Sequence, residues 1–84
     1  MHYFIIVQRR AQKRLSRFPT YIQDRIEMGL RGLSEDPRPS GSSKLRGKEG
    51  WRIRVGDYRA IYEIDDESRE VLVLDIAHRK DIYR

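Results

Sequence analysis

The stretch from Trp51 to Tyr62, which reads W-R-I-R-V-G-D-Y-R-A-I-Y, carries the most regular pattern in this 84-residue chain. Apolar residues alternate with arginines on both sides of the dipeptide Gly56-Asp57. Alternation of period two that is interrupted by Gly-Asp predicts a β-hairpin with a two-residue turn. This turn sets a register with three opposed pairs, which are Val55 with Tyr58, Arg54 with Arg59, and Ile53 with Ala60.

The two faces of this hairpin differ in character. One is apolar and predicts a surface that packs on the core, made of Trp51, Ile53, Val55, Tyr58, Ala60 and Tyr62. The other gathers Arg52, Arg54 and Arg59, which we call the arginine face. Like charges directly opposite each other destabilise a sheet, whereas guanidinium groups on a rigid support suit a phosphate ligand. The alternative is a set of ordinary surface arginines whose carboxylate partners lie elsewhere, with Glu63 as a candidate.

Length and composition narrow the class of protein. The chain is long enough for one domain, 1–84, with a modest core, and it lacks cysteine, so disulfides and Cys-ligated zinc are excluded. Two distant histidines make a structural metal site a poor expectation, and we expect no metal and no cofactor. No stretch has the length of an export signal or a membrane span, which leads us to expect a cytoplasmic protein that does not bind membranes. Residues 1–59 carry 14 Lys or Arg against 6 Asp or Glu, and this basic body predicts a polyanion or an acidic protein as partner.

The first half of the chain predicts one strand and two helices. A β-prone run, 3–7, is apolar on both faces, so it is covered on both sides or lies beside a covered strand. Helical spacing of apolar residues then predicts a short amphipathic helix over 8–17 and a second helix over 21–35, which form an antiparallel hairpin. Thr20 and Gln23 fit a capping box at the start of the second helix. Gly29 and Gly32 suggest close approach of its backbone to the first helix.

The second half predicts a basic loop, a buried strand and a polar end. Residues 37–50 form a connection rich in Pro, Ser, Gly and Lys, where Leu45 is the one apolar anchor. The nearly continuous apolar run 71–77 is typical of a strand inside a sheet, and we expect Leu72, Leu74 and Ile76 to face the core. The tail after His78 is polar, but Ile82 and Tyr83 give it side chains that can dock.

The chain resembles the RelE/ParE toxin superfamily, specifically its RelE branch, in the order of its strand, two helices, basic loop and hairpin and in its closing A-H-R-K-D-I-Y-R. The resemblance covers essentially the whole chain. It implies an α+β fold in a single small domain, in which a curved, mainly antiparallel β-sheet carries an N-terminal two-helix hairpin on one face, in the order β-α-α-β-β-β. It also implies a toxin of a type II toxin-antitoxin system that cleaves messenger RNA in the ribosomal A site and is neutralised by its antitoxin.

By position, the resemblance assigns the catalytic residues of such an enzyme to Arg52, Arg54, Arg59, Arg79 and Tyr83. Further basic residues are expected to bind RNA, namely Lys44, Arg46, Lys48, Lys80 and Arg84. Well-studied relatives have lysines where this chain has Arg52 and Arg54. Because arginine stays protonated at ordinary pH, the resemblance does not identify the general acid in this chain. Tyr83 is a candidate to stack on a base or take the 2′-hydroxyl proton, and His78 is a further candidate base that we leave outside the core set.

The chemistry expected of these residues is metal-independent transesterification, in which the RNA 2′-hydroxyl attacks the adjacent phosphate. The expected partners are the ribosome with its mRNA and a RelB-like antitoxin. The antitoxin is expected to fold an acidic segment over the toxin. Operator DNA is expected to be contacted by the antitoxin, and so only indirectly by the toxin. Two alternatives remain open. One is a ParE-like inhibitor of DNA gyrase without nuclease activity, and the other is a catalytically weak relative that only binds its antitoxin.

Overall fold

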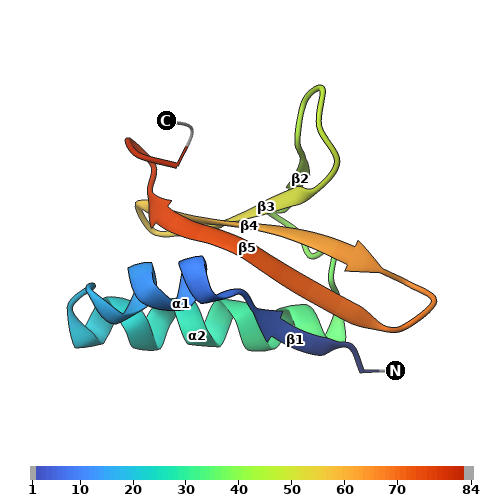
Figure 1. Ribbon diagram of the computed structural model, residues 1–84, viewed down its shortest axis with the longest axis horizontal. Coiled ribbons are helices and arrows are strands. Elements are labelled where there is room, and N and C mark those ends of the chain that lie inside the picture. The colour runs from blue at the N-terminus through green and yellow to red at the C-terminus, as the bar shows by residue number, and fades with distance from the viewer. Residues whose placement is uncertain (1, 83–84) are drawn as a thin grey trace.

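The computed structural model describes residues 2–82, which form one sheet with two helices on one side of it (Figure 1). The elements in chain order are β1 (Phe4–Val7), α1 (Arg9–Ser16), α2 (Thr20–Glu35), β2 (Ser43–Lys44), β3 (Trp51–Val55), β4 (Tyr58–Asp65) and β5 (Glu70–His78). The strand order across the sheet is β1-β5-β4-β3-β2. Only β1 pairs in parallel, with β5, and the other pairs are antiparallel, so the mainly antiparallel α+β architecture expected from the sequence is confirmed. The short strand β2 was not expected.

The hairpin of β3 and β4 has the predicted register, with Val55 opposite Tyr58, Arg54 opposite Arg59 and Ile53 opposite Ala60. Gly56 begins its two-residue turn at φ +59°, a left-handed conformation that glycine adopts without steric cost. A positive φ at the first central residue is the feature of type II′ turns, whose twist matches that of the paired strands.

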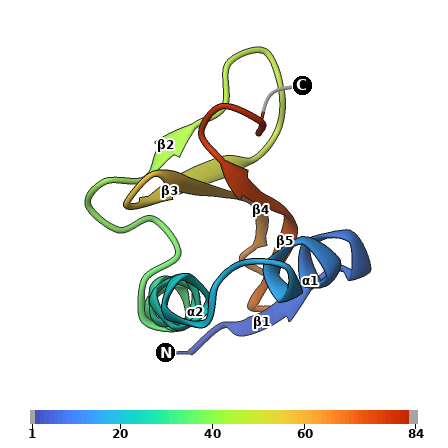
Figure 2. The same ribbon diagram turned by 90° about the vertical axis from the view of Figure 1, so that its left-hand side faces the viewer.

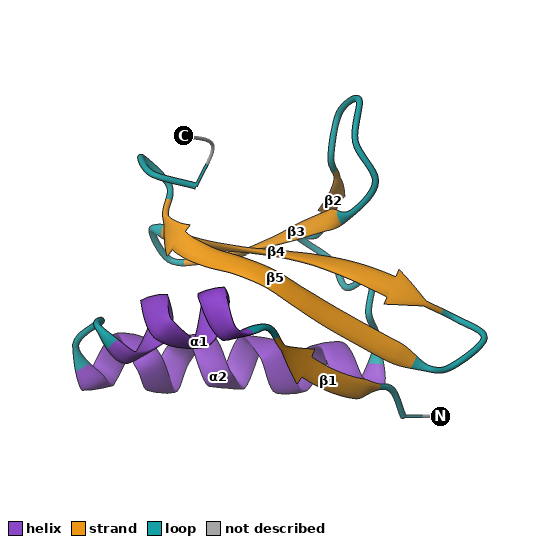
Figure 3. Cartoon of the chain, in the orientation of Figure 1, coloured by secondary structure: helices purple, strands orange, loops and turns teal. Residues whose placement is uncertain are grey.

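The core lies between the sheet and the two helices, which run antiparallel to each other (Figures 1 and 3). Helix α1 contributes Ala11, and α2 contributes Ile26, Leu30 and Leu33, from the apolar stripe that its sequence predicts. The sheet contributes side chains from β3, β4 and β5, the most buried being Tyr62, Val71, Val73 and Ile76, at 0% exposure.

Two sequence expectations about α2 are wrong. The capping box does not form, because α2 begins at Thr20 itself, its N-cap is Pro19, and no side chain caps it. Gln23 instead donates its side-chain amide to the carbonyl of Phe18 over 2.8 Å. Neither glycine lies in close contact with α1. A Cβ on Gly29 would lie 3.0 Å from Cγ2 of Val55 in β3, and a Cβ on Gly32 would meet nothing within 4 Å. The close approach is therefore between helix and sheet.

The phase of β5 differs from expectation, whereas β1 lies beside a buried strand, one of the two positions expected of it. In β5, Val71, Val73 and Ile76 are buried, whereas Leu72 and Leu74 are only partly buried. The cause is a register shift between Ile61 and Tyr62 of β4, which pair with Asp75 and Val73 and so leave Leu74 as an extra residue. Such a bulge reverses the phase of the alternation. Strand β1 lies beside β5 at the edge of the sheet, and its Phe4 is 73% exposed.

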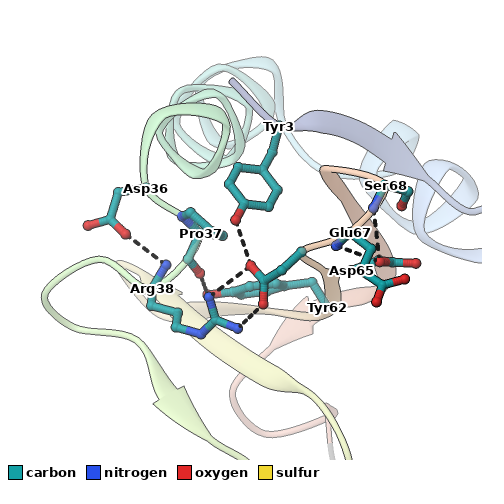
Figure 4. Close-up of polar contacts among 9 residues, drawn as sticks. Tyr3, Asp36, Pro37, Arg38, Tyr62, Asp65, Glu67 and Ser68 are labelled. Carbon is teal, nitrogen blue, oxygen red and sulfur yellow. Dashed lines mark hydrogen bonds and ion pairs between the residues drawn. The ribbon is translucent and has the colours of Figure 1, made fainter. Parts of the chain in front are cut away.

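A polar clamp ties three distant segments together at the end of the sheet (Figure 4). Arg38, in the connection after α2, donates two hydrogen bonds to the carboxylate of Asp66 in the turn between β4 and β5, at 2.9 and 3.3 Å. The hydroxyl of Tyr3 donates to the same carboxylate over 2.6 Å. Close by, the buried hydroxyl of Tyr62 donates to the carbonyl of Pro37 over 2.8 Å. The connection after α2 is therefore anchored where it leaves the helix.

The clamp makes a prediction about acid stability. The hydrogen bond from Arg38, followed by that from Tyr3, lowers the pKa of Asp66 from 3.8 to about 2. A carboxyl group with a lowered pKa in the folded state stabilises the fold above its unfolded pKa, and this contribution is lost as the pH falls through the folded pKa. We expect Asp66→Asn to lower the melting temperature at neutral pH, and the difference from the wild-type protein to shrink as the pH falls from about 4 to about 2.

Thermal unfolding monitored by circular dichroism across this range is the measurement. Glu67→Gln, which removes a neighbouring carboxylate with no side-chain contact in the described residues, is the matched control. A melting-temperature difference for Asp66→Asn that stays constant with pH would contradict the assignment of the clamp.

Candidate functional site

The arginine face lies on the side of the sheet opposite the helices. Ile53 and Ala60 are buried against the core, at 6% and 1% exposure. Because successive side chains of a strand point to opposite faces, Arg52, Arg54 and Arg59 project from the other side. The loop after β2 and the tail after β5 both rise on that same side (Figures 1 and 2). The open face of the sheet is therefore flanked by two basic segments.

Arg54 and Arg59 lie directly opposite each other across β3 and β4. The guanidinium group of Arg59 folds onto its own turn, where Nη1 donates to the carbonyls of Gly56 and Tyr58 over 3.0 and 2.9 Å. Within residues 2–82, neither Arg54 nor Arg59 forms an ion pair with a carboxylate, and Glu63 forms none either. The carboxylate partners that the alternative interpretation expects are therefore not found for Arg54 and Arg59 within these residues.

Arg52 is held at the other end of β3 by the short strand β2. Its Nε donates to the hydroxyl of Ser43 over 2.8 Å, and Ser43 is also its partner in the ladder between the two strands. This contact fixes the direction of a half-buried guanidinium group. Sequence analysis missed Ser43, because a strand of two residues is too short to show an alternating pattern.

The tail brings Arg79 to the turn of the hairpin. Its backbone N–H donates to the carbonyl of Asp57 over 2.8 Å, and its Nε lies 3.9 Å from the carboxylate of the same residue. Ile82 is buried, at 6% exposure, so the expected docking of the tail through this residue is confirmed. Arg79 thus lies beside the same turn that Arg54 and Arg59 flank. Tyr83 and Arg84, which the sequence also placed in the site, lie outside the described residues.

The remaining basic candidates are exposed on the two flanking segments. Lys44 lies in β2, Arg46 and Lys48 lie in the loop that follows it, and Lys80 lies in the tail. Leu45 is half-buried, and its N–H donates to the carbonyl of Gly50 over 3.0 Å, so the apolar anchor expected in this loop is present. The cationic side chains therefore extend from the turn of the hairpin to the loop at its open end.

His78 does not belong to the arginine face. It lies opposite Tyr58, a residue of the core face, and the two rings meet edge to face with centroids 5.4 Å apart. Tyr58 in turn contacts Phe18, at 4.8 Å between centroids. The imidazole opens into a cavity of about 540 Å³ that is also lined by Arg14, Arg17, Phe18, Tyr58, Ala77 and Asp81. As a candidate base for chemistry on the arginine face, His78 therefore points away from the reacting groups.

Neither a metal cluster nor a membrane-spanning helix is found in the part of the chain that the structure describes. No three His, Asp or Glu residues within 2–82 are placed to share a metal ion. No helix within that range has the length and apolar character needed to cross a bilayer. The described chemical groups of the site are guanidinium and ammonium ions, with the carboxylate of Asp57 beside Arg79. Guanidinium and ammonium ions bind anions and stabilise developing negative charge.

Comparison with known proteins gives consistent matches over almost the entire chain. The family model described as the ParE toxin of type II toxin-antitoxin system, parDE, matches residues 5–83. The protein named Toxin RelG, from Mycobacterium tuberculosis (strain ATCC 25618 / H37Rv), is 35% identical over 86 residues, which cover 100% of this chain and 99% of that protein.

Solved structures agree with these matches. The archaeal RelE-RelB complex from Pyrococcus horikoshii OT3 contains a chain with a TM-score of 0.85 and 25% identity, over 96% of this chain and 99% of that chain. The toxin-antitoxin complex RelBE2 from Mycobacterium tuberculosis contains a chain with a TM-score of 0.85 and 30% identity, over 96% of this chain and 95% of that chain. A mutant of the E. coli toxin RelE in the free state has a TM-score of 0.78 and 26% identity, over 99% of this chain and 90% of that chain.

The opposed arginines make a prediction about stability. Arg54→Glu replaces a repulsive cross-strand pair by an attractive one, and we expect the free energy of unfolding to rise by about 0.2 to 1 kcal/mol. The measurement is urea unfolding at low salt. Arg46→Glu makes the same change of charge on the exposed loop and serves as the control. An equal effect of both substitutions would mean that net charge, rather than the opposed pair, sets the difference.

Proposed function

Because the chain belongs to the RelE/ParE superfamily of type II toxin-antitoxin toxins, we propose that it is a ribosome-dependent endoribonuclease of the RelE type. Its substrate is messenger RNA in the ribosomal A site, and its action inhibits translation and growth until an antitoxin neutralises it. The relatives named RelG and RelE support the RelE branch of the family. The proposal also draws on the described site.

The observation that carries this proposal is the opposed pair Arg54 and Arg59 on the open face of the sheet. The pair lacks a carboxylate partner within residues 2–82, so each folded molecule keeps two positive charges together at a cost in stability. An anionic ligand relieves this repulsion. A phosphodiester is such a ligand, and its oxygens accept the paired N–H donors of a guanidinium group.

The proposed reaction is transesterification within the RNA. The 2′-oxygen forms a bond to the adjacent phosphorus, the bond from phosphorus to the 5′-oxygen of the next nucleotide breaks, and the products are a 2′,3′-cyclic phosphate and a 5′-hydroxyl. Arg54 and Arg59 stabilise the negative charge that develops on the phosphorane. Arg79 approaches the same phosphate from the tail, and Arg52 contacts the neighbouring part of the strand. Preorganised donors of this kind contribute roughly 2.7 to 4 kcal/mol each to transition-state stabilisation.

Proton transfer is the weaker part of this machinery. The proton of the 2′-hydroxyl must go to a base, and the leaving 5′-oxygen must receive one. Arginine does neither at ordinary pH, because it stays protonated. We propose Tyr83 in its deprotonated form as the base that takes the 2′-hydroxyl proton, and expect water to supply the leaving-group proton, so that charge stabilisation carries most of the rate. The loop residues Lys44, Arg46 and Lys48, together with Lys80 and Arg84, bind the RNA backbone on either side.

The proposed protein partner is a RelB-like antitoxin. The matched structures from Pyrococcus horikoshii and Mycobacterium tuberculosis are complexes of a toxin with its antitoxin. The helices of this chain offer a surface of mixed character. Tyr21 and Met28 on α2 are 67% and 69% exposed, α1 exposes Arg9, Arg10 and Lys13, and Arg17 is exposed at its C-cap. An acidic amphipathic segment of the antitoxin complements this surface, through apolar side chains on α2 and carboxylates on α1. Operator DNA is then contacted through the antitoxin.

A second candidate function is inhibition of DNA gyrase without RNA cleavage. The family model that matches the chain is described as the ParE toxin, and this description favours it. The cluster of arginines at the turn of the hairpin counts against it, because an inhibitor of a protein needs no such phosphate site. A third candidate is a weak enzyme that mainly binds its antitoxin. This candidate is favoured by Arg52 and Arg54, which stand where well-studied relatives have lysines.

The nuclease proposal predicts the effect of removing single arginines. Arg59→Ala and Arg79→Ala each remove one donor, and we expect cleavage rates to fall by about 10²- to 10³-fold while the fold is retained. The measurement is primer extension on a defined message, with programmed ribosomes and with naked RNA. Arg31→Ala, on the exposed side of α2, is the matched control and should cleave at the wild-type rate.

Cleavage confined to A-site codons on ribosomes would support the RelE-type assignment. If the wild-type protein cleaves in neither setting and inhibits supercoiling by gyrase, the second candidate is correct instead. Wild-type rates in both arginine variants would remove these residues from the catalytic set.

The antitoxin proposal predicts a separable effect on neutralisation. Met28→Glu places a negative charge on the surface that we assign to an acidic segment, and we expect the affinity for the cognate antitoxin to fall by about tenfold or more. Isothermal titration calorimetry measures this affinity. Ser40→Glu makes a similar addition of charge in the exposed connection and should leave the affinity unchanged. RNA cleavage by Met28→Glu in the absence of antitoxin should equal that of the wild-type protein, and unchanged affinity would place the antitoxin elsewhere.

A further inference from the structure

The tail begins with a single helical turn that His78 starts. The carbonyl of His78 accepts hydrogen bonds from the N–H groups of Asp81, over 2.8 Å, and Ile82, over 3.2 Å. These bonds span three and four residues and define one turn of helix, in which Arg79 is the first residue and Lys80 the second. The first N–H groups of any helical turn have no partner inside it.

The imidazole of His78 supplies the missing partner. Its Nδ1 accepts a hydrogen bond from the backbone N–H of Lys80 over 3.2 Å. This is the bond that an N-cap side chain makes to the second residue of a helix. Nδ1 therefore presents its lone pair to the N–H of Lys80. The edge-to-face contact with Tyr58 holds the ring in this orientation.

The same turn carries Arg79 to the hairpin. The N–H of Arg79 donates to the carbonyl of Asp57, and Ile82 is buried at the end of the turn. The direction in which the tail leaves β5 thus depends on the backbone bond at Asp57, the ion pair between Arg79 and Asp57, the burial of Ile82, and the cap. The backbone contact at Asp57 fixes where Arg79 starts, and the cap fixes the path of the chain after it.

We propose that His78 is a positioning residue that, through the lone pair on Nδ1, caps the turn of the tail and holds Arg79 against the arginine face. This inference rests on the proposed nuclease function for its effect on activity, but the cap itself is a property of the fold. His78 touches no reacting atom in this assignment, because its ring lies on the helix side of the sheet.

Two substitutions separate the cap from the other roles of the ring. In His78→Asn, the side-chain oxygen occupies nearly the position of Nδ1 and accepts the same bond, and asparagine is a preferred N-cap residue. In His78→Gln, the amide lies one bond further from the backbone and does not reach the N–H of Lys80. Both substitutions remove the aromatic contact with Tyr58 equally, so the difference between them reports the cap.

The first readout does not depend on activity. Hydrogen exchange of the Lys80 amide, followed by NMR spectroscopy at constant pH, should be about fivefold to tenfold faster in His78→Gln than in His78→Asn, which should resemble the wild-type protein. Equal exchange in the two variants would overturn the proposal, since the ring nitrogen would then not protect this amide.

The second readout is RNA cleavage on programmed ribosomes. His78→Gln should cleave roughly tenfold to a hundredfold more slowly than the wild-type protein, because a displaced guanidinium group stabilises the transition state poorly, and His78→Asn should restore most of the rate. Equal losses in both variants would overturn the positioning role. If the wild-type protein does not cleave but the exchange rates differ as expected, the nuclease proposal fails while the cap and its effect on the tail stand.

Discussion

The constraint on which this structure depends is that only one face of its sheet is covered. Two helices supply apolar side chains to that face, and no helix or strand within residues 2–82 covers the other. Strand side chains alternate between faces, so every residue next to a buried one in β3 and β4 is directed away from the core. The hairpin register then fixes the face to which each side chain beside the turn points. Val55 and Tyr58 face the core, so Arg54 and Arg59 meet on the open face of the sheet. The repulsion between these arginines is a consequence of the register that buries the core.

The fold also determines where the flanking basic segments go. The polar clamp of Tyr3, Arg38 and Asp66 holds the connection after α2 at one end of the sheet, so the chain enters β2 there and the basic loop follows on the open side. At the other end, the bulge in β5 places Ile76 on the core face, while Ala77, which pairs with Arg59, is buried on the opposite face. The tail leaves from that end over the turn of the hairpin. Both segments border the same open face because the sheet is anchored at both ends.

Sequence alone predicted the parts of this fold in which an alternating or helical pattern is long enough to define its phase, that is, which of its residues face the core. The hairpin alternates over twelve residues around one glycine turn, and its register was predicted pair by pair. The apolar stripe of α2 was predicted in the same way. The phase of β5 was not, because the run from Val71 to Leu74 is apolar at every position and so looks the same in either phase. The bulge that decides the phase depends on pairing with β4, which is a tertiary property.

The candidate site likewise has features that a sequence pattern predicted and features that it did not. The arginine face was visible in the sequence, since its residues lie in the alternating stretch, whereas the resemblance to a family supplied the roles of Arg79 and Tyr83. Contacts that no pattern encodes were not predictable, including the hydroxyl of Ser43 at Arg52, the carbonyl of Asp57 at Arg79 and the imidazole at the Lys80 amide. Each joins segments that are brought together only by the folded sheet.

These contacts bear on the role that arginine plays at 52 and 59. A lysine presents one mobile ammonium group, whereas the planar guanidinium group is held in a fixed direction by a single side-on hydrogen bond and still has donors to offer. Arg52 has such a bond at Nε, and Arg59 has bonds at Nη1. An active site assembled from groups fixed in this way trades the ability to donate a proton for precision in placing charge. In the proposed nuclease, such a site stabilises a dianionic transition state well and moves protons poorly, so the proposed rate depends on how firmly the sheet and the tail hold the arginines in place.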